Sequence, residues 1–252
     1  SAPEDSQVSD HEPVLVGSST GARLGSTLAI CADMDGDLLS EWAVSAPQDN
    51  SGEVLAGSVT LMLSSETSHV TRIDDETAHR WTGSVRGELA GHSLDCSNDL
   101  TGDGVADLVV GAPFSDGSAD GSGRIYVISG GAIPPNGSLE DASSRTLSGL
   151  TQDAWTGWSI STGDMSGDGR AEIVAGSPGM DASRGWVLIW DGADIAQRGD
   201  LYPDYRIVGA FEGDRFGHRV ILSDLDDDEL SDLLISASRE TPTDDEVNRA
   251  PG

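Results

Sequence analysis

The sequence contains no lysine, and its 14 basic residues, all of them arginine, stand against 44 acidic residues, for a formal net charge of −30. A field this negative repels nucleic-acid phosphates and anionic lipid head groups. We therefore expect neither nucleic acid nor a membrane surface as a partner, and consider divalent cations and basic surfaces instead. Solubility in a secreted or halophilic protein explains part of the excess of acidic residues. The remaining acidic residues need another explanation, which their regular spacing along the sequence suggests.

Long apolar runs are also absent. The longest, residues 186–190, is far too short to span a bilayer, so no membrane insertion is expected. Aromatic residues make up only 5%, helical periodicity is missing, and 32 glycines favour many short strands joined by turns. No export signal opens the sequence, which predicts that any such signal lies upstream or has been removed. Residues 1–12 are polar and acidic and predict a disordered lead-in.

A repeat organises the rest of the chain. Four segments each begin with a glycine, pass through an acidic loop and end in a short tripeptide of small residues or proline. The first aspartates of these loops are spaced by 66, 65 and 60 residues, and they are Asp33, Asp99, Asp164 and Asp224. Self-similarity at a nearly fixed period is the signature of a repeat architecture.

Each period predicts four strands. Apolar stretches precede the loop, as in 26–30 and 219–222, and follow it, as in 108–110 and 233–235. Further strands are predicted at 59–63, 125–128 and 186–190, and then at 145–147 and 206–208. The stretch after the loop is apolar without a break, which suits a strand covered on both faces. Four strands per repeated unit are typical of a β-propeller blade.

The predicted fold is therefore all-β, a propeller with blades of four antiparallel strands. It occupies residues 13–252 as about four blades, the last of them incomplete. Residues 14–17 resemble the fourth strand of a preceding blade. Because strands are missing at both ends, we predict a fragment of a larger ring.

The acidic loops suggest a cation site. Each has nine residues, with side-chain oxygens at the first, third, fifth and ninth positions. Calcium is a hard ion that takes six to eight oxygens, at about 2.3–2.6 Å, from carboxylates, carbonyls and water. We predict one Ca²⁺ per loop, with the backbone carbonyl of the seventh residue as a further ligand. The predicted ligands are Asp33, Asp35, Asp37, Leu39 and Glu41; Asp99, Thr101, Asp103, Val105 and Asp107; Asp164, Ser166, Asp168, Arg170 and Glu172; and Asp224, Asp226, Asp228, Leu230 and Asp232.

Two other interpretations of the loops were weighed. An EF-hand requires an acidic residue at position 12 and flanking helices. Position 12 is apolar in every copy, which excludes that motif: Val44, Val110, Ala175 and Ile235. A solvated turn explains any single loop, but four loops in register favour a site. The fourth loop has Asp227 in place of glycine and Glu229 at position 6, so its geometry is the least regular.

Only two cysteines are present, too few for a disulfide scaffold or a zinc site. Cys31 and Cys96 stand two or three residues before an acidic loop, at matching places in neighbouring repeats. A bridge between adjacent blades and a pair of buried free thiols are both compatible with these positions, and the free thiols are the slightly favoured alternative.

The pair Phe216-Gly217 and the tripeptide Gly111-Ala112-Pro113, which bracket the acidic loop, resemble the FG-GAP repeat of integrin α-subunit propellers and their bacterial relatives. The resemblance covers about residues 14–240. It implies a ring of typically seven blades, a calcium loop between the first two strands of a blade, and a role in adhesion or as an extracellular module.

The copies depart from that pattern in places. The phenylalanine is replaced by Leu24, Ala90 and Thr156, and the tripeptide becomes 236–238, Ser-Ala-Ser, in the last copy. These departures leave the implied fold and calcium intact. Ligand specificity would lie in loops that the repeat does not constrain.

The leading functional hypothesis is a secreted, non-catalytic, calcium-binding scaffold for a protein or glycan ligand, assembled with the remaining blades of a parent propeller. An accessory propeller of a secreted hydrolase and a structural surface-layer or stalk module are the alternatives. Nothing resembles a nucleophile elbow, a zinc-binding His-Glu motif or a phosphate loop. Residues 198–200, Arg-Gly-Asp, fit an ordinary turn. His92 and His218 are expected to lie too far apart around the ring to share a metal.

Overall fold

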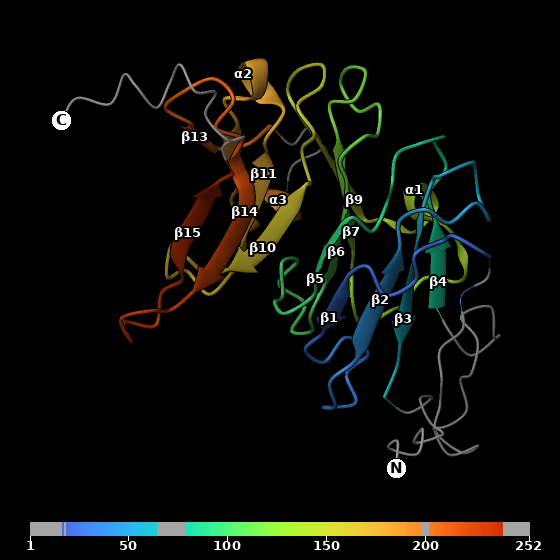
Figure 1. Cartoon of the computed structure of the whole chain (residues 1–252). Coiled ribbons are helices and arrows are strands. Elements are labelled where there is room, and N and C mark those ends of the chain that lie inside the picture. The colour runs from blue at the N-terminus through green and yellow to red at the C-terminus, as the bar shows by residue number, and fades with distance from the viewer. Residues whose placement is uncertain (1–16, 18, 65–78, 198–201, 239–252) are drawn as a thin grey trace, which may run out of the picture.

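The computed structural model describes residues 17, 19–64, 79–197 and 202–238. Strands make up 36% of the structure and helices 6%, which confirms the all-β prediction. The strands form separate sheets that stand side by side along a curved row (Figure 1). The predicted lead-in at 1–12, the predicted strand at 14–16 and the tripeptide at 198–200 lie outside the described residues.

Three sheets contain the four antiparallel strands expected of a blade, and we number the blades along the chain. Blade 1 contains β1 (Leu28–Ile30), β2 (Trp42–Ala46), β3 (Ser58–Met62) and β4 (His79–Thr82). Blade 2 contains β5 (Ser93–Asp95), β6 (Leu108–Ala112), β7 (Arg124–Ile128) and β9 (Arg145–Ser148). Blade 3 contains β10 (Ser159–Gly163), β11 (Glu172–Ser177), β12 (Trp186–Trp190) and β13 (Tyr205–Val208).

The fourth sheet has two strands in the described part of the chain, β14 (Phe216–Ser223) and β15 (Asp232–Ala237). A short strand, β8 (Gly137–Ser138), runs parallel to β4 and extends the first sheet. Three short helices interrupt the loops: α1 (Leu139–Ala142), α2 (Met180–Ser183) and α3 (Gly192–Gln197). The strands β4 and β8 and these helices were not predicted from the sequence, because segments of two to six residues carry no readable periodicity. No described helix is long and apolar enough to cross a membrane.

The hydrophobic core lies between blades. Leu108 and Val110 of β6 pack in a cluster with residues of blade 1, whereas Val109 between them packs with residues of blade 3. The apolar run that follows each acidic loop is therefore covered on both faces, as predicted. The first and second strands pair in one register in every blade, through Leu28↔Val44, Leu94↔Val110, Ile160↔Ala175 and Val220↔Ile235.

The outer faces of the first and last blades lack such a neighbour among the described residues. Leu94 is 9% exposed and its register equivalent Leu28 is 67% exposed. Likewise Val109 is fully buried, but Leu234 at the equivalent place in β15 is 45% exposed. The described sheets form an open row and no closed ring, so this is part of a propeller, as the sequence predicted.

The structure explains the glycine that opens each repeat and the glycine that begins the tripeptide of the second and third repeats. Gly157, shortly before β10, and Gly217, near the start of β14, have φ angles of 87° and 85°, in the left-handed region that favours glycine. Their carbonyl oxygens press against Gly111 and Gly176 of the preceding blade, where an added Cβ would overlap them. In blades 2 and 3 the glycine that opens the small tripeptide thus allows the close approach of the next blade.

Cys31 and Cys96 form a disulfide, so the favoured expectation of free thiols was wrong. Their Cα atoms are 4.6 Å apart, well within bridging range. The Ala32 N–H donates to the Cys96 carbonyl, so the chain leaving β1 runs beside the chain leaving β5. The bridge therefore joins blades 1 and 2, and both cysteines are buried.

Candidate metal centres

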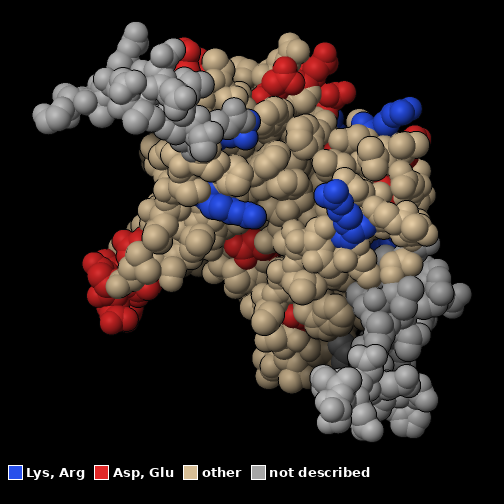
Figure 2. All heavy atoms as spheres, viewed as in Figure 1, with Lys and Arg blue, Asp and Glu red and all other residues tan. Residues whose placement is uncertain are grey.

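Each acidic loop connects the first and second strands of its blade, and the four loops lie on the same edge of the molecule, the lower edge in Figure 1. Acidic side chains gather visibly at the tip of the β14–β15 hairpin in Figure 2. A hairpin tip is a favourable place for a cation loop, because the paired strands hold the two ends of the loop together.

The first aspartate of each loop shapes the turn. In the first loop Asp33 accepts the Gly36 N–H at 2.7 Å and the Leu38 N–H at 2.9 Å. Asp99 and Asp164 accept the same two N–H groups of their own loops. In the fourth loop the bonds shift, and Asp224 accepts from Asp228 at 3.2 Å and Glu229 at 2.9 Å.

Positions 4 and 6 of every loop have positive φ. They are glycines in the second and third loops, whereas the first loop places Leu38 at φ 69° and the fourth places Asp227 at 62° and Glu229 at 71°. The left-handed conformation is energetically unfavourable for these three residues, because each of them has a Cβ atom. The fourth loop thus keeps the turn without its glycine, at the expense of a less regular hydrogen-bond pattern.

The ninth residue ties the loop to its base. One carboxylate oxygen of each accepts the N–H of the second loop residue, at 2.7 Å in the first three loops and 3.0 Å in the fourth. Glu41 and Glu172 are buried, and the second oxygen of each, Oε1, has no hydrogen-bond partner within the part of the chain that the structure describes. A buried carboxylate oxygen without a partner is costly unless something else satisfies it.

Asp107 differs from these two glutamates. Its Oδ2 accepts N–H groups from Leu100 and Thr101, and its Oδ1 accepts the Gly130 N–H at 3.0 Å. Both oxygens of this buried carboxylate are therefore engaged by the backbone.

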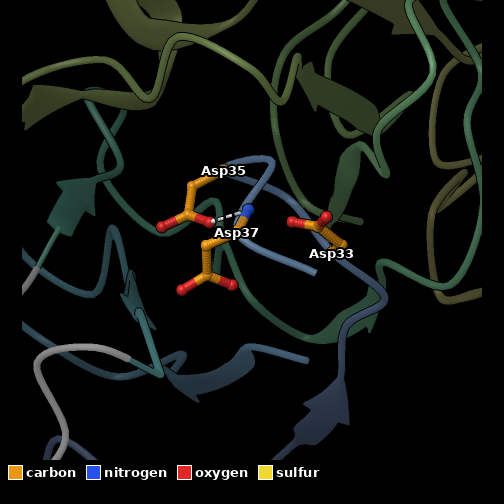
Figure 3. Close-up of side chains that lie close together, drawn as sticks. All are labelled: Asp33, Asp35 and Asp37. Atoms are coloured by element: carbon orange, nitrogen blue, oxygen red, sulfur yellow. Dashed lines mark hydrogen bonds between the residues drawn. The ribbon is translucent and has the colours of Figure 1, made fainter. Parts of the chain in front are cut away.

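Three loops bring three carboxylates together, with one oxygen of each within 4.8 Å of the others. The groups are Asp33, Asp35 and Asp37; Asp164, Asp168 and Glu172; and Asp224, Asp226 and Asp232. Figure 3 shows the first group, in which the Asp35 carboxylate also accepts the Asp37 N–H. Among described residues, Asp99, Asp103 and Asp107 of the second loop form no such group. Thr101 supplies no carboxylate there, and Asp107 is both shorter than glutamate and held by Gly130.

The fifth residue of each loop accepts the N–H of the seventh, at 2.8–3.1 Å. Its carboxylate is thereby held over the turn. The seventh-residue carbonyls of Leu39, Val105, Arg170 and Leu230 stay predicted ligands, as do the hydroxyls of Thr101 and Ser166.

The carboxylates raise one another's pKa. Burial raises the pKa of Glu41, and the charges of Asp35 and Asp37 raise it further. Burial likewise raises the pKa of Glu172, with added repulsion from Asp191 and Asp164. At the exposed fourth loop, repulsion by Asp228 raises the pKa of Asp226. Negative charge is therefore in excess at these loops, which is the electrostatic condition that a bound cation relieves.

Neighbouring loops are also joined by backbone bonds that the sequence does not reveal. The Ala106 N–H of the second loop donates to the Asp33 carbonyl at 2.8 Å. The Ser231 N–H of the fourth loop donates to the Asp164 carbonyl at 2.7 Å. The same positions, first and eighth, make both bonds, so blades 1 and 2 and blades 3 and 4 are paired through their loops.

An aromatic cluster lies at the other end of the first strands, and the sequence analysis did not anticipate it. Trp158, directly before β10, lies between His92 and His218, with ring centroids 4.4 and 5.7 Å away. The two histidines are thus nearer to each other than their repeat positions suggested. Phe114 and Trp155 complete the cluster at 5.9–6.0 Å, and all five rings are half-buried.

The blades and their hairpin loops define a β-propeller of the FG-GAP type. Residues 99–175 match the family model of the FG-GAP-like repeat. Human integrin alpha-8 is 30% identical over 161 residues, covering 59% of this chain and 13% of that protein. Human integrin alpha-IIb is 30% identical over 216 residues, covering 81% of this chain and 19% of that protein. Chicken integrin alpha-V is 30% identical over 98 residues, 39% of this chain and 9% of its own length.

These findings confirm the resemblance predicted from the sequence: the chain is an FG-GAP, integrin-like propeller. It spans less than a fifth of the length of each of these relatives. The similarity supports an integrin-like propeller module.

Proposed function

We propose that this module is a calcium-binding extracellular scaffold without catalytic activity, which presents one face of its blades to a protein or glycan ligand. The observation that carries the calcium proposal is the buried, unpartnered Oε1 of Glu172. That side chain belongs to a group in which oxygens of Glu172, Asp164 and Asp168 lie within 4.8 Å of one another. A cation placed among them would satisfy the buried oxygen and neutralise the repulsion at once.

The donor set favours calcium over other metals. Carboxylate, hydroxyl and carbonyl oxygens are the ligands of hard cations, and the described loops contain neither histidine nor cysteine at the ligand positions. Magnesium demands a small, rigid octahedron at about 2.0–2.1 Å, whereas a hairpin loop with ligands spread over nine residues suits the larger and more variable shell of calcium.

The extracellular assignment rests on the disulfide and on the relatives. Disulfides persist in oxidising compartments and are rare in the cytosol. The buried Cys31–Cys96 bridge supports export, and integrin similarity supports a protein as the ligand. The half-buried rings of Phe114, Trp155 and Trp158 offer a contact surface at the end of the blades opposite the acidic loops. Aromatic side chains of this kind are enriched at protein interfaces.

Thermal unfolding in calcium and in chelator tests the calcium proposal. A ligand bound only by the folded state stabilises it by about 2.7 kcal/mol per site at a hundredfold excess over its dissociation constant. For two occupied sites the melting temperature should rise by about 10 °C or more in a protein of this size. Magnesium at the same concentration should stabilise less. Unfolding curves that overlay in calcium and in chelator would contradict the proposal.

A further inference from the structure

In the third and fourth loops the seventh residue extends over the loop of the preceding blade. A side chain built at Gly167, position 4 of the third loop, would meet Cδ2 of Leu230 from the fourth loop at 3.0 Å. A side chain built at Gly102, position 4 of the second loop, would meet the guanidinium of Arg170 from the third loop. Position 7 is apolar in the other three loops, with Leu39, Val105 and Leu230, so Arg170 is the exception.

The guanidinium of Arg170 lies flat over the second loop. Its Cζ, Nε and Nη2 atoms are each 3.8 Å from the point where a Gly102 Cβ would stand, so a face of the planar group points at this glycine. The Gly102 N–H in turn donates to Asp99 Oδ1 at 2.6 Å. A permanent positive charge thus lies next to the residue that holds the first carboxylate of the second loop.

Arg170 has no salt bridge of its own among the described residues. Within the described ranges, the ion pairs involve Arg80, Arg124 and Arg184. The Arg170 charge is therefore available to act on the nearby second loop. Because the side chain is half-buried, solvent screens that charge less than it would at the open surface.

We infer that Arg170 is an internal counter-charge for the second loop and weakens divalent-cation binding there, an inference that rests on the proposed calcium function. Three observations converge on this loop. Its carboxylates form no three-membered group, both oxygens of Asp107 are engaged by the backbone, and a guanidinium takes the place of an apolar side chain above it. Blade 3 thus sets the cation affinity of blade 2.

Substitution of Arg170 by leucine tests the inference, because leucine is the residue at position 7 of the first and fourth loops. Calcium titration by calorimetry of the whole chain should show one site strengthened by about tenfold, the effect of removing one nearby charge at the dielectric of a protein surface. Arg86→Gln is the matched control for net charge, since Arg86 is exposed and lies in the segment between β4 and β5, outside the acidic loops. Arg170→Gln should give the same gain as Arg170→Leu.

A double-variant comparison assigns the gain to one loop. Arg170→Leu combined with Asp103→Asn, which disables the second loop, should lose the gain, whereas Arg170→Leu with Asp168→Asn, which disables the third loop, should keep it. A gain that follows the third loop, an equal gain from Arg86→Gln, or no gain while other sites still bind would overturn the inference alone. Flat isotherms for the wild type and Arg170→Leu alike would overturn the proposed function together with the inference.

Discussion

Blades 1 and 2 and blades 3 and 4 are joined by the same backbone bond between their acidic loops, yet the two pairs are reinforced differently. The first pair carries the Cys31–Cys96 bridge, and backbone N–H groups of its second loop and of Gly130 engage both oxygens of Asp107. The second pair has no disulfide, and its third loop leaves a buried oxygen of Glu172 without a partner among described residues. The covalent bond distinguishes the first pair, whereas each pair contains one loop with a buried glutamate oxygen that has no partner among the described residues, Glu41 in the first loop and Glu172 in the third.

The largest expected effect concerns the disulfide. A bridge across a separation of 65 residues restricts the unfolded chain, which corresponds to about 4 kcal/mol in the chain-entropy model. The double variant Cys31→Ser, Cys96→Ser should lose about that much unfolding free energy in urea titrations. Hydrogen exchange should rise in blades 1 and 2 and change little in blades 3 and 4. A uniform rise across all the blades would contradict the distinction between the pairs.

The ninth loop residues should respond in opposite ways. Asp107→Asn places an amide opposite backbone N–H donors in a buried site. The substitution should therefore lower the free energy of unfolding by about 3 kcal/mol, in chelator as well as in calcium. Glu172→Gln keeps the size of the side chain and removes repulsion with Asp164 and Asp168, so its stability in chelator should change by less than about 1 kcal/mol.

Calcium separates these two variants. Glu172→Gln should lose most of the stabilisation that calcium confers through the third loop, whereas Asp107→Asn should retain it. The measurement is unfolding free energy in urea with calcium and with chelator for both variants. Equal losses for the two variants in chelator would show that both carboxylates serve the same purpose.

A smaller and pH-dependent effect is expected at Asp49, which is buried in blade 1 and forms an ion pair with Arg80. Burial opposes ionisation there, but hydrogen bonds from Ser58 and Ser51 and the charge of Arg80 lower the pKa of Asp49 to about 2. The folded pKa lies below the ordinary value of 3.8, so the ionised carboxylate stabilises the fold above about pH 4. That contribution is lost as the pH falls from about 4 to 2.

Asp49→Asn should therefore lower the free energy of unfolding by about 2 kcal/mol at pH 6, and by progressively less below pH 4. Urea midpoints at pH 6, 4 and 3 measure the difference. Glu140→Gln is the control, because Glu140 pairs with Arg124 at the surface and is 51% exposed. A surface pair of this kind contributes at most about 1 kcal/mol. A cost of Asp49→Asn that stays constant with pH would show that the charge is not what stabilises blade 1.

The repeat could be recognised from the sequence because its signals are local. Acidic residues at alternating positions, glycines at turns and unbroken apolar runs each depend on neighbours within about ten residues, and they placed β6, β7, β12 and β15 to within about two residues. The strand β4 escaped because its four residues, His79–Thr82, include a single large apolar side chain.

The sequence by itself determined most strands of the blades, the acidic loops that join the first two strands of each blade and the residues at the tips of those loops. Tertiary structure decided which loops differ: Gly130 engages Asp107, Arg170 covers Gly102, and Cys31 reaches Cys96. These contacts join residues separated by 23 to 68 positions. The Gly130–Asp107 contact depends on how the strands of blade 2 pair, and the other two depend on how one blade packs against the next. Local propensity carries no information about that packing, because it is set by the shapes of whole sheets and by the apolar side chains buried between them.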